Sequence, residues 1–459
     1  MKARALGLLL LSLSWLGCDR AFSPPTGPNL VLVSIDTLRA DRIGAYGYAR
    51  GTTPRIDALA GSGFVFERGY APSSNTIISH ASLLTSLYPV AHGVRPDVPL
   101  DDRLLTLADA MQQAGWETAG FTSHGDWLNE ELGFAQGFDH FVSGWGDGVL
   151  VNRAVESWLE GRPEPERPFL LFVHYYDVHS DTAMLPYQSP PRFRQRFAAG
   201  SVGPFRGCRD GHCGTRLLQE ADGGLVPISD EELRWISDLY DGGVAYADHL
   251  VGRLLGRLEA EGALDASWIA ITADHGEEFR EHGHLLHTQG YEETARVPFI
   301  LRPPLAWEPR RGDGRIGVPV ALVDLMPTLL DAAAQAIPAD LEGRSLLPLM
   351  SGEELPEHPV YFSHIEAPDR VSVRTSEFGL ISNPEPATPE LYDALADPQQ
   401  HRDVAARHPD VVHRLGETAS TFHAGQLERR SQHAPGPGRT PTPEERARLE
   451  ALGYVDTAE

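Results

Sequence analysis

The residues of this chain that could do chemistry stand where predicted strands end. An aspartate closes the apolar run "NLVLVSID" at residues 29–36, and acids and histidines follow the runs "PFLLFVH" and "SWIAIT". These residues are Asp36, His174, Asp177, His179, Asp274 and His275. Carboxylate and imidazole groups are natural ligands of a divalent cation. If the three strand ends meet, they predict a metal site, whereas a lone aspartate would more simply cap a helix or form a turn.

Buried parallel strands would bring these residues together. The runs are apolar and β-branched, and the carboxyl ends of parallel strands meet at one edge of a sheet. Helices are predicted over 103–115 and 229–262, the second beginning with a capping box of Ser229 and Glu232. Strands alternating with helices predict a mostly parallel sheet covered on both faces.

Another candidate stands ahead of a predicted helix. In "SSNTIISHASLLTSLYP", residues 73–89, the part from Ser79 onward is predicted to be a helix that ends at a proline. Thr76 lies about one turn before it, where outward-pointing backbone N–H groups favour anions. Thr76 is therefore either a helix-starting residue or the group that attacks the substrate.

Composition limits the classes of function. A chain of 459 residues exceeds what one core needs, so two domains, or one large α/β domain with an appendage, are expected. The formal charge of −25 argues against binding to nucleic-acid phosphates, and no lysine- or arginine-rich stripe offsets it.

Residues 1–18 are predicted to be an export signal rather than part of the fold. Lys2 and Arg4 precede an apolar run that is too short to span a bilayer, and the run ends in Gly17-Cys18. This end resembles a bacterial lipoprotein cleavage site with Cys18 as the lipidated residue. We therefore expect a periplasmic or cell-envelope lipoprotein, associated with the membrane through an N-terminal lipid. Trp15 departs from the usual residue at its position and leaves plain secretion open.

The other two cysteines lie close together in "GCRDGHCGT". In an exported protein, Cys208 and Cys213 most simply form a disulfide that closes a small loop. A metal clip built from Cys208, His212 and Cys213 is the alternative.

Two regions interrupt the alternation of strands and helices. Residues 180–228, rich in Pro, Gly and Arg, are predicted to be an ordered insertion near the site, within a catalytic domain spanning 29–355. Residues 356–425 are expected to form a smaller unit of antiparallel strands and a helix. Residues 426–459 are expected to be a linker followed by a short capped helix.

Several stretches of the chain resemble the sulfatase family of the alkaline phosphatase superfamily. They run in order between residues 29 and 405 and include "VLVSIDTLRADRIGAYGY", "SHASLLTSLYP", "GWETAGF", "DHGEEFREHG" and "YEETARVPFI". The resemblance implies an α/β/α sandwich with a mostly parallel central sheet and a metal at the carboxyl ends of the strands. It also implies a smaller C-terminal α+β subdomain.

The chain departs from the family at the nucleophile. Sulfatases carry a cysteine or serine, converted to formylglycine, in the pattern Cys/Ser-x-Pro-x-Arg. Alignment on "SLLT" places Thr76, Ile78 and His80 at its three fixed positions. Threonine cannot become formylglycine, because oxidation of its branched carbon would give a ketone. A cation-bound threonine hydroxyl can still attack phosphorus, as in the phosphodiesterase and phosphotransferase branches of the superfamily.

Other family positions are changed as well. Thr37 replaces one of the paired metal-binding aspartates, so Asp36 stands alone, and the lysine-x-histidine motif after "GWETAGF" is absent. His287 replaces the lysine before "YEE", while His179 keeps the family's Asp-x-His anion contact. Histidines thus stand where cationic side chains would hold a sulfate.

These features predict an exported, metal-dependent hydrolase, or a transferase, of phosphate or sulfate esters, with phosphoester chemistry favoured. Thr76 is the expected nucleophile on a small-molecule, glycan or lipid ester, without formylglycine. The cation (Ca, Mn, Mg or Zn) is expected at Asp36, Thr76, Asp274 and His275. The residues expected to stabilise charge or move protons are His80, His179 and His287. A second cation could be held by Asp177, His179 and His287. The alternatives are a sulfatase that works without formylglycine and a relative that binds an anionic glycan without turnover.

Overall fold

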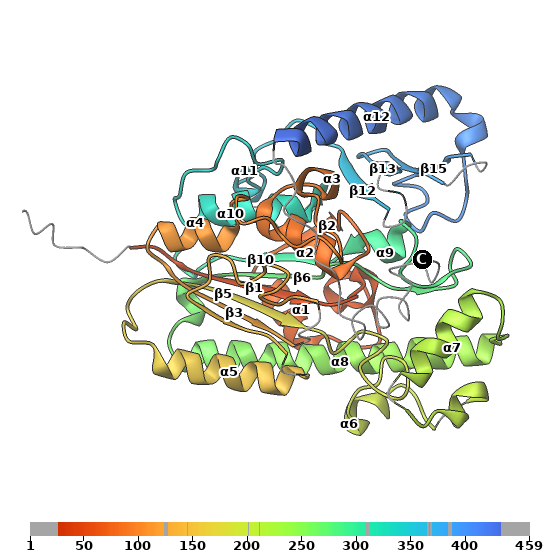
Figure 1. The fold of residues 1–459 in the computed structure, drawn as a ribbon, viewed down its shortest axis with the longest axis horizontal. Helices are drawn as coiled ribbons and strands as arrows, with labels where there is room; N and C mark the ends of the chain where they lie inside the picture. The colour runs from red at the N-terminus through yellow and green to blue at the C-terminus, as the bar shows by residue number, and fades with distance from the viewer. Residues whose placement is uncertain are drawn as a thin grey trace, which may run out of the picture.

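A sheet of nine strands forms the centre of the larger domain (Figure 1). The computed structural model describes residues 26–123, 127–144, 146–200, 202–210, 212–308, 312–364, 367, 370–383 and 388–432. The strand order is β11-β2-β10-β6-β1-β5-β3-β4, with β9 paired to β2. The strands are β1 Asn29–Ile35, β2 Phe64–Tyr70, β3 Glu117–Thr122, β4 His140–Val142, β5 Phe169–Tyr175, β6 Ser267–Thr272, β9 Arg296–Val297, β10 Phe299–Arg302 and β11 Arg315–Ala321. Strands β9 and β10 run antiparallel to their neighbours, and the other pairs are parallel.

The central strand β1 lies between β5 and β6, in register with both. Ser34 is level with His174 on one side and with Thr272 on the other. Both neighbouring strands are buried along their whole length, as is β1 from its second residue, which explains their unbroken apolar runs. Because the three strands are parallel, the residues that follow them emerge at one edge.

Helices cover both faces of this sheet. Figure 1 shows α5 (Gly148–Gly161) and α8 (Asp230–Ala260) below it, and α2 (Thr76–Thr85), α4 (Leu107–Gln113) and α10 (Leu325–Ala332) above it. The predicted capping box at the start of α8 is confirmed. The helix predicted over 103–115 is shorter, because Thr106 caps it at residue 107. Shorter elements are α1 Pro54–Ala60, α3 Pro89–His92, α9 Glu292–Ala295, α11 Leu347–Met350, β7 Glu278–Phe279 and β8 Leu285–Leu286.

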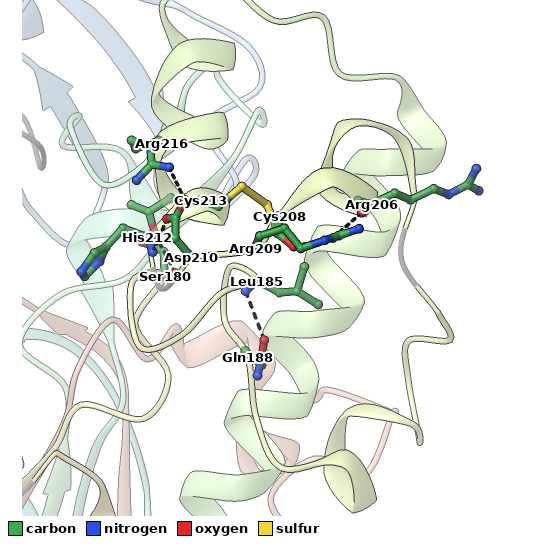
Figure 2. The surroundings of a disulfide bond; sticks show 11 residues. Ser180, Leu185, Gln188, Arg206, Cys208, Arg209, Asp210, His212, Cys213 and Arg216 are labelled. Atoms are coloured by element: carbon green, nitrogen blue, oxygen red, sulfur yellow. Dashed lines mark hydrogen bonds and ion pairs between the residues drawn. A yellow bond between two sulfur atoms is a disulfide. The ribbon is translucent and has the colours of Figure 1, made fainter.

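The described part of the segment 180–228, predicted to be an insertion, contains the helices α6 (Pro191–Arg194) and α7 (Cys213–Asp222). A disulfide joins Cys208 to Cys213 at the start of α7, as predicted, so the alternative of a metal clip is wrong (Figure 2). At the other end of α7, the Asp222 carboxylate accepts a hydrogen bond of 2.7 Å from the backbone N–H of Leu285. The insertion therefore contacts the segment that leads to His287.

The smaller C-terminal unit is an antiparallel sheet with one helix against it. Its strands are β12 Val360–Ser363, β13 Val371–Arg374, β14 Phe378–Ile381 and β15 Glu390–Asp393, and its helix is α12 Pro409–Gln432. Val373, Leu380 and Leu415 lie in the apolar core between them. The predicted α/β/α sandwich with a C-terminal α+β subdomain is therefore confirmed.

The linker predicted to begin at residue 426 does not begin there, because α12 continues to Gln432. The side chain of Gln426 is buried and donates a hydrogen bond to Glu342 of the larger domain, which holds this part of the helix in place. The rest of the predicted linker, the short helix after it and the predicted export signal lie outside the described residues. Within the described ranges, no helix is both long and apolar enough to cross a membrane.

Candidate active site

The ends of β1 and β6 bring Asp36, Asp274 and His275 together. One ligand atom of each lies within 4.8 Å of the others, and all three side chains are fully buried. The backbone N–H of Asp36 still bonds to Tyr175 O (2.9 Å), which extends the pairing of β1 with β5 by one residue. In the part of the chain that the structure describes, no other trio of potential ligands meets this condition. The metal site predicted from these three residues is thus assembled geometrically.

Each of these side chains has one buried atom without a hydrogen-bond partner among the described residues. The atoms are Asp36 Oδ1, Asp274 Oδ2 and His275 Nε2. The other polar atom of each side chain has a hydrogen-bond partner. Asp274 Oδ1, for example, accepts the N–H groups of Thr37 (3.2 Å) and His275 (2.9 Å). His275 Nδ1 lies 3.0 Å from Gly276 O and must donate to it, so Nε2 presents a lone pair. Unpartnered buried acceptors are costly, and a divalent cation would satisfy all three. The residues therefore fit a cation.

The electrostatics of the two aspartates also suit a cation. Burial and the neighbouring Asp274 carboxylate raise the pKa of Asp36 well above its usual value. Burial opposes ionisation of Asp274 too, but His275 and His80 lower its pKa to about 2. Two carboxylates this close in a buried site repel each other when both are ionised. A bound cation would remove that repulsion.

Thr76 is the first residue of α2 and is not its cap. The cap is Asn75, whose side-chain oxygen accepts the N–H of Ile78 at 3.1 Å. The helix predicted from Ser79 therefore starts three residues earlier, and Thr76 begins the helix without capping it. Its hydroxyl instead donates to Asp36 Oδ2 at 3.3 Å, at the edge of the ligand group.

His80 does not occupy the role predicted for it. Its Nδ1 lies 2.8 Å from Thr76 O, and its Nε2 lies 2.9 Å from Ser34 Oγ. Burial and the neighbouring His174 lower its pKa to about 3, and its side chain is fully buried. A neutral imidazole with both nitrogens engaged can neither stabilise an ester oxygen nor carry its proton. His80 sits one turn after Thr76 and fixes the position of the helix start that carries it.

His179 and His287 form a second part of the site, in which each imidazole meets a carboxylate. His179 Nδ1 lies 2.7 Å from Asp181 Oδ1, and His287 Nδ1 lies 3.1 Å from Glu277 Oε1. Burial opposes protonation of His179, but Asp181 outweighs it and raises the pKa of His179 to about 9. The two rings are 5.4 Å apart, and the His287 ring is 4.6 Å from that of His275. The histidines thus stand beside the ligand group, as the sequence predicted.

Asp177 does not join these histidines, which corrects the predicted second cation set. Its carboxylate oxygens accept the N–H of Gly148 at 3.2 and 3.1 Å, at the start of α5. Burial raises its pKa to about 7. A helix start leaves backbone N–H groups without partners, and this aspartate supplies one. Within the described residues, Asp177, His179 and His287 form no group close enough to hold one ion.

Some contacts of the site were not predicted from the sequence. Asp181 and Glu277 hold the two histidines, and their only signal was an acid near a histidine in "HSD" and "DHGEE". Thr37, where the family has an aspartate, acts through its backbone N–H on Asp274. It takes a left-handed φ of 53°, which is strained for a β-branched residue, and its buried hydroxyl has no partner among the described residues. His174, which the sequence placed among the strand-end candidates, also enters the site, with Nε2 3.3 Å from Asp36 Oδ2.

Comparisons with known proteins agree with this architecture. The family model described as Sulfatase matches residues 28–336, and one described as N-sulphoglucosamine sulphohydrolase, C-terminal, matches residues 280–421. The chain is 25% identical to an N-acetylglucosamine-6-O-sulfatase of Bacteroides thetaiotaomicron, over 92% of each protein. It is 26% identical to the multifunctional alkaline phosphatase superfamily protein PehA of Trinickia caryophylli, over 71% of this chain and 77% of that protein. The solved phosphonate monoester hydrolase of Agrobacterium radiobacter superposes with a TM-score of 0.68 at 21% identity, covering 90% of this chain and 100% of that one.

Proposed function

The chain belongs to the sulfatase family, and from that premise we propose that it is a metal-dependent hydrolase of phosphate esters with Thr76 as nucleophile. The observation that carries the proposal is the hydrogen bond of 3.3 Å from the Thr76 hydroxyl to Asp36, at the edge of the three-ligand group. Thr76 cannot be converted to formylglycine, so a direct attack by its hydroxyl replaces the chemistry of the sulfatase aldehyde.

A divalent cation held by Asp36, Asp274 and His275 would acidify the attacking hydroxyl and neutralise charge on the ester oxygens. The chain itself supplies the geometry. Asn75 caps α2 and His80 holds the Thr76 carbonyl, so the hydroxyl is fixed before the substrate arrives. Such positioning removes part of the entropic barrier to reaction.

The histidines would then handle the proton and the charge. Thr76 Oγ1 would pass its proton to Asp36 Oδ2, which accepts its hydrogen bond, and form a bond to phosphorus while the bond from phosphorus to the leaving oxygen breaks. His179, kept protonated by Asp181, is the group that can stabilise the non-bridging oxygens or donate a proton to the leaving oxygen. His287, oriented by Glu277, would stand next to it. Water resolves the phosphothreonine ester in a hydrolase, and an acceptor hydroxyl would do so in a transferase.

The names of the relatives make a sulfate ester the main alternative to a phosphate ester as the substrate. One is named as a sulfatase of N-acetylglucosamine, and another solved relative as a phosphonate monoester hydrolase. Phosphorus chemistry is therefore present among the neighbours of this fold. The lack of the family's lysine-x-histidine motif and the histidine at position 287 favour phosphorus in this chain.

A metal-supplemented assay tests the proposal. Purified protein is incubated with matched aryl phosphate monoester, phosphodiester and sulfate ester substrates, each with Ca, Mn, Mg or Zn. We expect turnover of a phosphate ester that needs the cation and that is lost in Thr76→Ala. Faster turnover of the sulfate ester would support a sulfatase without formylglycine. Binding of an anionic glycan with no turnover of any ester would support a non-catalytic relative.

We also propose that the protein is exported and lipidated at Cys18. The basic start, the short apolar run and the Gly17-Cys18 pair support this, and so does the disulfide between Cys208 and Cys213, since disulfides persist in oxidising compartments. Mass spectrometry of the mature N-terminus should find a lipidated Cys18. An intact Met1 would reject export of this kind.

A further inference from the structure

A separate cavity lies between the central sheet and the C-terminal sheet. Its volume is about 300 Å³. It is bordered by residues of β2 and β11 on one side and of β13, β14 and β15 on the other. None of the three candidate metal ligands lines it, nor does Thr76. Four arginines are among the lining residues: Arg68, Arg296, Arg315 and Arg374.

Two of the four guanidinium groups are paired with carboxylates. Arg315 Nε lies 2.8 Å from Glu67 Oε1, and Arg374 Nε lies 3.0 Å from Glu292 Oε1. The third lining carboxylate, Asp397, turns to the backbone N–H groups of its own loop, at residues 401 and 402. It is not the partner of a cavity arginine.

The other two guanidinium groups are held by backbone carbonyls. Arg68 donates to Thr375 O (2.6 Å) and Ser376 O (2.9 Å), and Arg296 donates twice to Glu67 O (2.9 and 2.7 Å). Within the described residues, neither has a carboxylate oxygen at ion-pair distance. Carbonyl contacts orient a guanidinium without neutralising it, so the lining, with four arginines and three carboxylates, keeps a net positive charge in a chain with a formal charge of −25.

Arg374 adds a donor that the fold leaves unused. Its side chain is almost wholly buried, at 2% exposure. While Nε and Nη2 bond to Glu292 and to Gly290 O, its Nη1 has no partner among the described residues. A buried guanidinium N–H without an acceptor is costly unless a ligand or water supplies one.

We propose that this cavity binds an oxyanion: sulfate, phosphate or a carboxylate, either free or carried on a saccharide. Guanidinium groups bind such groups through paired N–H donors, which explains a site rich in arginine in an acidic protein. The site stands apart from the reaction. The short helix α9 lies between the two: Arg296 follows it on the cavity side, while the carbonyls of Glu293 and Thr294 accept the N–H groups of Glu277 and Gly276, next to His275.

Equilibrium dialysis of metal-free protein with radiolabelled sulfate tests the proposal without reference to turnover. After chelation the metal centre no longer contributes, and we expect one saturable sulfate per chain. Arg296→Gln and Arg68→Gln should each weaken binding by about tenfold or more, the usual worth of a charge-assisted hydrogen bond. Arg253→Gln removes an arginine of α8 that is paired with Glu156 of α5; it is the matched control and should bind like the wild type.

A variant that removes no folding contact guards against unfolding as an explanation. Ala394→Glu places a carboxylate in the lining and should also weaken sulfate binding, with an unchanged circular dichroism spectrum. N-acetylglucosamine 6-sulfate in competition distinguishes the two sources. If the sugar sulfate displaces labelled sulfate at a concentration tenfold lower than unlabelled sulfate needs, the natural ligand is an anion carried on a saccharide. If the two competitors are equally potent, the natural ligand is a free anion. Failure to saturate, or binding unchanged in Arg68→Gln, Arg296→Gln and Ala394→Glu, would overturn the site.

Discussion

The two halves of the candidate site differ in how their polar groups are completed. On the metal side, Asp36, Asp274 and His275 each keep one buried atom without a partner among the described residues. On the other side, His179 and His287 each have an imidazole nitrogen held by a carboxylate. The first arrangement offers three buried ligand atoms to a cation, whereas in the second each histidine already has one nitrogen engaged by a carboxylate.

This difference indicates one cation rather than two. Metal-binding histidines usually donate one nitrogen to an orienting group and offer the other to the metal, which His275 does. His179 and His287 also have Nδ1 engaged by a carboxylate, but within the described residues they belong to no group of three ligands close enough to hold an ion. The aspartate predicted to complete a second set is committed to the start of α5. We therefore expect a metal on one side and a proton carrier on the other.

The largest expected effect is the loss of the Thr76 hydroxyl, which lies at the edge of the ligand group. Thr76→Ala should lower phosphate ester turnover by at least roughly 10³-fold, since no other group can form the covalent bond. Thr76→Ser keeps a hydroxyl and should retain measurable activity. Initial rates with saturating metal measure both. Near-native turnover by Thr76→Ala would return the residue to a structural role.

The next largest effect is expected from removing a ligand on the metal side. Asp274→Asn removes a charged ligand, and we expect the affinity for the activating cation to fall by more than about 100-fold, measured by calorimetry on metal-free protein. Asp241→Asn changes another fully buried aspartate, one paired with Arg42 and Arg50 away from the site, and is the control. Equal cation affinity in Asp274→Asn and wild type would remove Asp274 from the ligand set.

The position of the metal side could be predicted from the sequence, because its residues follow the ends of strands. Unbroken apolar runs identify parallel strands, and parallel strands must deliver Asp36 and Asp274 to one edge. What could not be predicted depends on side-chain direction. The amino-acid sequence does not indicate that Asn75 rather than Thr76 caps α2. It also does not indicate that the His80 side chain contacts Ser34 or that the Asp177 carboxylate contacts Gly148. Each outcome is decided by which polar group needs a partner in the folded chain.

Because Asp177 is buried against the start of α5, we expect the free energy of unfolding to depend on pH. Its folded pKa, about 7, lies above its usual value near 3.8, because burial disfavours the charged form. Protonated Asp177 is thus favoured by folding, and its stabilisation is present below pH 4 and is lost as pH rises toward 7 and beyond. Asp177→Asn should be more stable than the wild type at pH 8, by up to about 3 kcal/mol, and similar to it at pH 4. Urea unfolding at both pH values measures this, and an equal difference at both would contradict it.

The smallest effect is expected from a substitution on the histidine side. His287→Ala should lower turnover by roughly tenfold, since it removes one polar group beside the reacting centre and no metal ligand. Elemental analysis should find the same single equivalent of cation in His287→Ala and wild type. Two equivalents in the wild type, with one lost in the variant, would show that the histidine side also binds a metal.

Trapping the covalent intermediate tests the central claim most directly. The metal-loaded protein is mixed with an aryl phosphate ester that it turns over, quenched in acid within one turnover, digested, and analysed by mass spectrometry. The account predicts one phosphoryl group on the peptide that contains Thr76, located on that threonine, and none in Thr76→Ala. Full turnover with an unmodified Thr76 at every quench time, or a phosphoryl group on another residue, would contradict it.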